Sequence, residues 1–192
     1  MDTPELRESL RIPRWEGERA EAWFEMAWWR GQWELRGTGN WALEDKESGA
    51  LIGRAGLHNP EREDWPGVEV GWALHPDKWG LGYATEAGAE SIRYAFEDLD
   101  EDCLFSTILP DNHRSQSVAK RLGFVLVETK VLSHYLHEPH GIWMIRGEKF
   151  TLGKDNSGWW DGAIGYEVYL RSFADSNADG IGICKDSSNL TT

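Results

Sequence analysis

The stretch GVEVGWALHPDKWGLGYATEA, residues 67–87, decides the fold. Its first part, residues 68–74, alternates bulky apolar side chains with small or acidic ones, which predicts a strand with one apolar face and one nearly bare face. Gly80 and Gly82 follow, and then a helical pattern begins. Such a turn aims backbone N–H groups and the positive end of a helix dipole at one point, which suits a pyrophosphate. A tight strand-to-helix turn explains a lone GxG equally well.

The segments on either side of this stretch predict a single domain of mixed secondary structure. Hydrophobic periodicity and turn residues predict helices over 18–36, 84–98 and 115–122, and strands over 41–43, 50–57, 68–74, 104–109, 125–132 and 142–145. This order indicates an α/β (α+β) domain with a mixed, mostly antiparallel sheet and flanking helices, ending near residue 146. In the first helix, one broad face is predicted to pack into the core; its members are Ala20, Trp23, Phe24, Ala27 and Trp28.

Composition limits the classes of partner and compartment. The chain has 192 residues and a formal net charge of −13, which works against nucleic acid or an anionic membrane as a partner. An amine or a basic peptide fits this charge better. Cys103 and Cys184 are the only cysteines and lie far apart, so neither a disulfide framework nor a cysteine zinc site is indicated. There is no long apolar run and the start is acidic and polar, so a cytoplasmic protein is expected.

A second motif strengthens the first. About thirty residues after the glycine turn comes NHRSQSVAKRLGF, residues 112–124, and the two motifs in this order closely resemble the signatures of the GNAT superfamily of N-acetyltransferases. The nearest resemblance is to its RimJ/RimL-like branch, the ribosomal-protein N-terminal acetyltransferases. The resemblance implies a splayed sheet that holds acetyl-CoA as co-substrate between strands 68–74 and 104–109. It also implies acetyl transfer to a primary amine, either a protein N-terminus or a small molecule, and many relatives form homodimers.

The resemblance also assigns cofactor-binding positions residue by residue. The backbone of residues 79–84 would bind the pyrophosphate: Trp79, Gly80, Leu81, Gly82, Tyr83 and Ala84. The backbone of Trp72, Ala73 and Leu74 would pair with the pantetheine arm and hold the acetyl carbonyl. Asn112 would reach the cofactor with its side chain, although an ordinary helix N-cap explains this residue equally well. Trp79 stands where the wider superfamily has arginine or glutamine, as is typical of the branch.

Direct attack of an amine on a thioester needs a base and an acid. Glu69 is the candidate base, directly or through water, because it shares the bare strand face with Gly71 and Ala73; a structural or acceptor-binding carboxylate is the alternative. Many relatives place a tyrosine as the acid where this chain has Ala119. Ser115, one turn earlier on the same helix face, is the candidate substitute.

The two ends of the chain depart from the family pattern. We expect the acetyltransferase domain over residues 1–148, with the usual first strand reduced to residues 6–15 or missing. If the start is truncated, the alternative is an inactive remnant that binds coenzyme A. We expect residues 149–192 to be a foreign or disordered tail; their sequence resembles the opening of an α-amylase-type glycoside hydrolase and the first half of a calcium loop. No metal site is predicted, since His134, His137 and His140 do not share one face.

Overall fold

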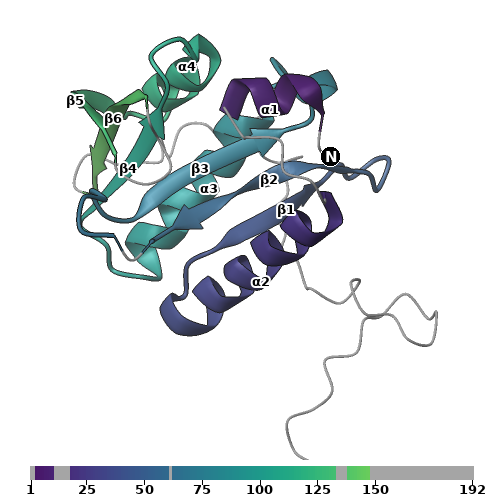
Figure 1. The fold of residues 1–192 in the computed structure, drawn as a ribbon, viewed down its shortest axis with the longest axis horizontal. Coiled ribbons are helices and arrows are strands. Elements are labelled where there is room, and N and C mark those ends of the chain that lie inside the picture. Colours follow the sequence, from purple (N-terminus) through teal and green to yellow (C-terminus); the bar gives the residue numbers. More distant parts are fainter. Residues whose placement is uncertain (1–2, 11–17, 61, 133–137, 148–192) are drawn as a thin grey trace, which may run out of the picture.

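The computed structural model describes residues 3–10, 18–60, 62–132 and 138–147. Its elements are α1 (Pro4–Leu10), α2 (Glu18–Arg36), β1 (Asn40–Glu44), β2 (Leu51–His58), β3 (Glu69–Leu74), the 3-10 helix η1 (Pro76–Lys78), α3 (Tyr83–Glu97), β4 (Cys103–Ile108), α4 (His113–Arg121), β5 (Val125–Val131) and β6 (Pro139–Arg146) (Figure 1). The strands form one sheet in the order β1-β2-β3-β4-β6-β5. Every neighbouring pair is antiparallel except β3 and β4, so the predicted mixed, mostly antiparallel sheet is confirmed.

The core lies between the sheet and helices α3 and α4. Figure 1 shows α3 behind the sheet, and α3 contacts both β2 and β3. The buried apolar side chains that meet there include Leu57, Val70, Ile92, Ala95, Leu104, Val118, Ala119 and Leu122. Removing these side chains from water is the main favourable contribution to folding. The core thus fixes α3, whose first residues follow the glycine turn, against the strand that precedes that turn.

Strands β3 and β4 separate almost at once. Their parallel pairing has a single register point, Glu69 opposite Phe105, and the N–H of Phe105 donates to the carbonyl of Val68 at 2.9 Å. Beyond this point β3 continues to pair with β2, and β4 continues to pair with β6. Strands β3 and β4 therefore diverge beyond Glu69 and Phe105, and the main-chain N–H and C=O groups on their facing edges are no longer paired with each other. The predicted splay between these two strands is confirmed.

Helix α2 does not bury the face that the sequence predicts. Trp23 is 65% exposed, Phe24 is 71% exposed and Trp28 is 39% exposed. The helix packs instead through Trp29 and Trp33, on the face that begins one residue after Trp28. The Trp33 ring centroid lies 4.9 Å from that of Trp41. Because α2 lies along the edge strand β1 and is apolar on several sides, periodicity alone could not select the packed face (Figure 1). The prediction for this helix was correct in extent and wrong in orientation.

The chain start is helical where a reduced first strand was one of two expectations. Residues 4–10 form α1, with Pro4 at its first position and the Thr3 hydroxyl accepting from the N–H of Leu6 at 3.2 Å. A threonine cap followed by proline favours a helix start, which explains why this segment is not extended. Leu6 is buried. The rest of the expected strand, the tail at 149–192, and His134 with His137 lie outside the described residues.

Candidate functional site

The glycine turn after β3 presents free backbone N–H groups. Gly80 and Gly82 adopt φ values of 77° and 94°, and a Cβ built on either would meet no atom within 4 Å. Gly82 caps α3 with its carbonyl, which accepts from Thr85 and Glu86. Within the described part of the chain, the N–H groups of residues 80–84 donate to no acceptor. Open space above a left-handed turn, together with unpaired amides at a helix N-terminus, is the arrangement that binds phosphate.

Side chains hold this turn against the end of β3. The indole N–H of Trp79 donates to the carbonyl of Leu74 at 2.9 Å, and the Arg114 guanidinium lies 4.3 Å from the Trp79 ring centroid. His75 caps η1, since its Nδ1 accepts from the backbone N–H of Asp77 at 3.3 Å. Trp79 therefore has a structural use, closing the turn onto the strand, where the wider superfamily has a polar residue.

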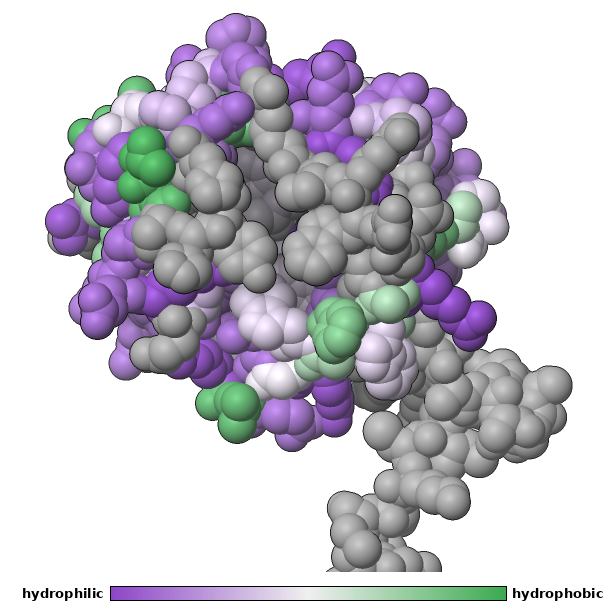
Figure 2. Space-filling view, viewed as in Figure 1, coloured by the Kyte–Doolittle hydropathy of each residue, from purple (hydrophilic) through white to green (hydrophobic). Residues whose placement is uncertain are grey.

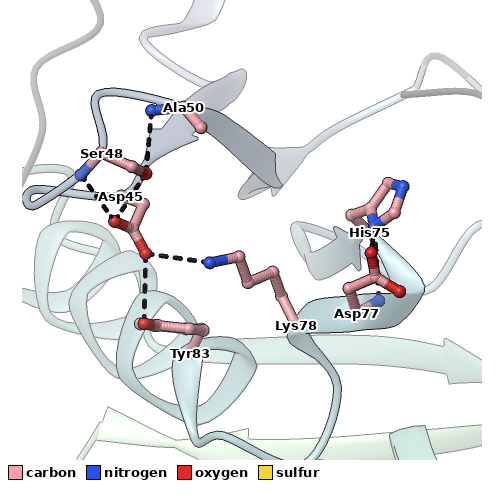
Figure 3. Close-up of polar contacts among 7 residues, drawn as sticks. All are labelled: Asp45, Ser48, Ala50, His75, Asp77, Lys78 and Tyr83. Carbon is pink, nitrogen blue, oxygen red and sulfur yellow. Dashed lines mark hydrogen bonds and ion pairs between the residues drawn. The ribbon is translucent and has the colours of Figure 1, made fainter.

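The turn between β1 and β2 supports the same region from the other side. Figure 3 shows Lys78 and Tyr83 pointing toward Asp45, with the Lys78 ammonium 3.1 Å from its carboxylate and the Tyr83 hydroxyl 3.5 Å away. The Ser48 hydroxyl and backbone N–H, and then Lys78, hold the pKa of Asp45 well below its usual range. The bond to Asp45 raises the pKa of Lys78. The ammonium is thus already paired, and the turn offers its backbone.

The three β3 residues predicted to hold the coenzyme arm face two ways. Ala73 pairs with Arg54 of β2, and the N–H of His75 donates to Ile52 at 2.8 Å. Antiparallel pairing alternates, so the main-chain groups of Ala73 point to β2 while those of Trp72 and Leu74 point toward β4. The side on which the two strands diverge therefore carries the main chain of Trp72 and Leu74. The main-chain groups of Ala73 are already used in the pairing with β2.

Asn112 is the N-cap of α4, as one of the two expectations stated. Its side-chain oxygen accepts from the N–H of Ser115 at 3.1 Å, and its amide nitrogen donates to the carbonyl of Ser9 in α1 at 3.2 Å. Ser115 is half-buried, and its hydroxyl makes no hydrogen bond to the described residues. Ala119, one turn later, is fully buried in the core. The cap leaves Asn112 tied to α1 and leaves the Ser115 hydroxyl available.

Two arginines of α4 flank the glycine turn, and sequence reasoning missed both. Arg114 stacks on Trp79, and Arg121, seven residues later on the same helix face, lies with its Nε 3.2 Å from the Thr85 hydroxyl in the first turn of α3. In a chain of net charge −13, these two arginines place two positive charges beside the glycine turn, the candidate phosphate-binding site. The signal that could have found them is their spacing within the second motif.

Glu69 is not on an open face. Its side chain is only 11% exposed, and its Oε2 lies 3.2 Å from Nδ1 of His58 in the neighbouring strand. Its Oε1 accepts from the backbone N–H of Thr107 at 3.0 Å and from the Thr107 hydroxyl at 2.5 Å. The carboxylate thus binds across the point where β3 and β4 separate, taking the place of a main-chain acceptor for Thr107. The bare face exists only at Gly71, where a Cβ would meet nothing within 4 Å.

The site therefore has two parts at opposite ends of β3. The glycine turn, α4 and the Asp45 turn form the first part, and the cluster of His58, Glu69 and Thr107 forms the second. Sequence reasoning found Glu69 but not His58, since residues from two strands become neighbours only through the register of the sheet. In the described ranges, no group of three His, Cys, Asp or Glu side chains lies close enough to hold a metal ion.

Comparison with known proteins agrees with this geometry. The family model described as "Acetyltransferase (GNAT) domain" matches residues 2–125. The crystal structure of an acetyltransferase from Agrobacterium tumefaciens superposes with a TM-score of 0.63 at 27% identity, over 75% of this chain and 79% of that one. The putative ribosomal N-acetyltransferase YdaF of Bacillus subtilis is 32% identical over 98 residues, 50% of this chain and 51% of YdaF.

A fungal relative extends the comparison. The FsC-acetyl coenzyme A-N(2)-transacetylase of Aspergillus fumigatus is 34% identical over 84 residues, which are 44% of this chain and 35% of that protein. The chain spans about half the length or less of the curated relatives it matches. The tail segment that resembles a glycoside hydrolase lies beyond the residues that the family model matches. With the splayed strands and the glycine turn in the expected places, the chain belongs to the GNAT acetyltransferase family.

Proposed function

We propose that this protein transfers an acetyl group from acetyl-CoA to a primary amine by direct attack, with no covalent enzyme intermediate. The observation that carries the proposal is the turn at Gly80 and Gly82, with free N–H groups and open space, next to two strands that diverge. A diphosphate fits that turn, because no described residue comes within 4 Å of a Cβ built on either glycine, and none of them accepts a hydrogen bond from the amides.

The residues proposed to hold the coenzyme follow from this fit. The backbone of residues 79–84 would bind the pyrophosphate, and the guanidinium groups of Arg114 and Arg121 would add charge beside it. The main chain of Trp72 and Leu74 would pair with the coenzyme arm on the side facing β4. Ala73 would contribute its small side chain, and Asn112 its remaining amide hydrogen.

Glu69 and Ser115 are proposed for proton transfer. The buried carboxylate of Glu69 already contacts Nδ1 of His58 and accepts from the N–H of Thr107, which supports an action through a neighbouring group rather than by direct contact with the amine. The Ser115 hydroxyl, at the start of α4, is proposed to protonate the leaving thiolate. Ser115→Ala tests this role: we expect a lower kcat with unchanged binding of acetyl-CoA. An unchanged kcat would remove Ser115 from the mechanism.

Two kinds of acceptor amine are proposed: a protein N-terminus and a small-molecule amine. The likeness to YdaF, whose name describes a putative ribosomal N-acetyltransferase, supports the RimJ/RimL-like branch and hence a peptide N-terminus. The name of the fungal relative, an acetyl coenzyme A-N(2)-transacetylase, supports a small amine. The negative net charge of the chain favours a cationic acceptor in both cases.

Further proposals concern domain limits and partners. We place the acetyltransferase domain within residues 1–148 and treat 149–192 as an appended segment. Pairing of two copies is supported by β5, an edge strand on which Val125, Val127 and Val131 are each more than half exposed. Among the described helices, none is long and apolar enough to cross a membrane. The cytoplasmic location and the absence of a nucleic-acid partner stay predictions.

One assay tests the function. The protein is incubated with acetyl-CoA and a panel of small amines and N-terminal peptides, and release of the coenzyme thiol is followed. Thiol release that depends on one acceptor, with the acetylated product identified by mass spectrometry, supports the proposal. Tight coenzyme binding without release on any acceptor contradicts it and favours the inactive remnant.

A further inference from the structure

His58, at the end of β2, is surrounded by three tryptophan side chains. Its ring centroid lies 4.6 Å from that of Trp28, 5.6 Å from that of Trp29 and 5.4 Å from that of Trp65. These rings come from α2 and from the loop before β3, two segments with no role in the glycine turn. We call this group, His58 with Trp28, Trp29 and Trp65, the tryptophan cage. It encloses an imidazole that contacts a buried carboxylate.

The contact with Glu69 selects one tautomer of the neutral His58 ring. An ionised carboxylate only accepts, and Glu69 accepts from Thr107 at Oε1 and faces Nδ1 of His58 at Oε2, 3.2 Å away. Nδ1 therefore carries the hydrogen, and in the neutral ring the lone pair is on Nε2. A carboxylate that holds an imidazole in this tautomer is the arrangement by which enzymes make histidine a general base.

Three ring nitrogens of the cage are buried and have no hydrogen-bond partner in the part of the chain that the structure describes: His58 Nε2, Trp29 Nε1 and Trp65 Nε1. Native proteins leave few buried polar atoms unpaired, and a cluster of them around one side chain calls for a polar group that the described residues do not supply. Nε2 accepts a hydrogen bond, whereas the two indoles donate. A molecule with an amine next to an oxygen complements this set.

The cage also lies at the right place in the sheet. Glu69, which binds His58, marks the last contact of β3 with β4 before the strands diverge. The glycine turn is at the other end of the same strand, a span of about 20 Å for six extended residues. An arm that runs along β3 from the turn would end near Glu69, so His58 is on the acceptor side of the site.

We propose that His58 is the general base of the reaction, that Glu69 positions it, and that the acceptor is an amine with a neighbouring oxygen, such as a peptide N-terminus. This inference rests on the proposed function and deepens it. His58 Nε2 takes a proton from the acceptor ammonium, and the freed lone pair on nitrogen forms the bond to the acetyl carbonyl carbon. The carbon–sulfur bond then breaks and its electron pair goes to sulfur. The Ser115 hydroxyl protonates the thiolate and regains a proton from the second N–H of the former amine, which leaves the neutral amide and the free thiol.

Removal of the imidazole tests the base. His58→Ala should lower kcat by about 10²- to 10⁴-fold, the usual contribution of a general base, while the dissociation constant for acetyl-CoA stays unchanged. Free imidazole should restore part of this kcat, because the small molecule can occupy the vacated space. The matched control is His113→Ala, an exposed histidine on α4, which should keep wild-type kcat with and without imidazole.

The near-isosteric His58→Gln keeps the test decisive if the alanine variant fails to fold. It should give a normal circular dichroism spectrum and acetyl-CoA affinity with the same loss of kcat. A folded His58 variant with kcat within about threefold of wild type, or a folded His58→Ala whose loss imidazole does not relieve, would overturn the inference and leave the proposed acetyltransfer standing. Absence of turnover by the wild-type protein on every amine would instead refute the proposed function.

The indole N–H groups test the acceptor class. Trp29→Phe and Trp65→Phe keep a ring and remove the donor, so each should lower kcat/KM for an alanyl tetrapeptide by about threefold to tenfold, the usual size for one hydrogen bond. The same variants should leave kcat/KM for 1,4-diaminobutane, which has no oxygen, unchanged. Equal losses for both acceptors, or no loss for the peptide, would overturn this part of the inference.

Discussion

The two ends of strand β3 are built on different principles. At its C-terminal end, the turn at Gly80 and Gly82 offers main-chain N–H groups, and side chains such as Trp79 and Asp45 only hold that main chain in place. At its N-terminal end, Glu69 and His58 offer side-chain atoms, and the sheet register brings them together. The first end can be recognised in the sequence because its backbone shape requires glycine at positions 80 and 82. The second end depends on contacts between distant segments.

The largest expected effect is at the C-terminal end of β3, which we call the main-chain end because the glycine turn offers its backbone; the N-terminal end, with Glu69 and His58, is the side-chain end. Gly82 has φ = 94°, which a β-branched residue cannot adopt without strain, and its missing Cβ leaves the space where a phosphate would lie. Gly82→Val should therefore abolish coenzyme A binding, measured by isothermal titration calorimetry. Gly31→Ala, in α2, is the matched control, since an added Cβ there also meets no atom within 4 Å. A folded Gly82→Val with normal affinity would show that the turn is not the phosphate site.

Much of the main-chain end was predictable from sequence. The alternation in residues 68–74, the glycines and the helix start are local patterns, and local patterns determine local backbone. From residue 18 onward, the order of α-helices and strands was predicted for the same reason, with boundaries within a few residues. The Asn112 cap was also predicted, because a cap is a contact between residues three apart.

The side-chain end was predictable only in part. Glu69 stood out as an acid on a small-residue strand face, but nothing local indicated that His58, eleven positions earlier, would take one of its oxygens. Helix α2 shows the same limit. Its tryptophans occupy most of its circumference, so only the docking of Trp29 on His58 and of Trp33 on Trp41 reveals which side packs. At the chain start, Thr3 and Pro4 begin a helix over residues 4–10, so the first half of the possible strand over 6–15 is helical, and residues 11–15 lie outside the described residues.

The second prediction concerns the side-chain end. Glu69→Ala leaves the Thr107 N–H and the His58 ring without an acceptor, so it should lower the free energy of unfolding by about 2–4 kcal/mol. Glu69→Gln keeps an acceptor oxygen and should cost less than half as much, while still lowering kcat. Urea titrations and steady-state kinetics measure the two effects. Equal stability of wild type and Glu69→Ala would mean that Glu69 does not join β3 to β4.

The third prediction concerns the two arginines beside the glycine turn, the candidate phosphate-binding site. Arg114→Met and Arg121→Met keep the apolar stem and remove the charge, so each should weaken coenzyme A binding by about threefold to tenfold at low salt. The effect should shrink as salt is added, because exposed charges are screened. Arg93→Met on α3 is the control, since Arg93 already contacts Glu90, Glu97 and Asp98. If Arg93→Met weakened coenzyme A binding as much as the other two substitutions, the loss of affinity would come from the change in net charge and not from the position of Arg114 or Arg121.

The smallest effect is expected from the pair that supports the turn. The pKa of Asp45 is lowered in the folded protein, first by Ser48 and then by Lys78, so its stabilising contribution is fully present above the unfolded-state value of about 3.9. That contribution is lost as the pH falls from there toward the folded-state pKa. The pKa of Lys78 is raised, so its contribution is present below about 10.4 and lost only as the pH rises beyond it.

Between these two pH limits, the contribution of the Asp45–Lys78 pair to the free energy of unfolding does not change with pH. The difference in unfolding free energy between wild type and Asp45→Asn should therefore be level from about pH 5 to pH 9 and should shrink below about pH 4. Asp77→Asn, at a carboxylate that is 85% exposed, is the control and should show no such decline. If coenzyme A affinity also drops modestly in Asp45→Asn at neutral pH, the side chains behind the turn position its main chain. If affinity is unchanged, the glycine turn keeps its shape by backbone alone, and the contrast between the two ends of β3 is complete.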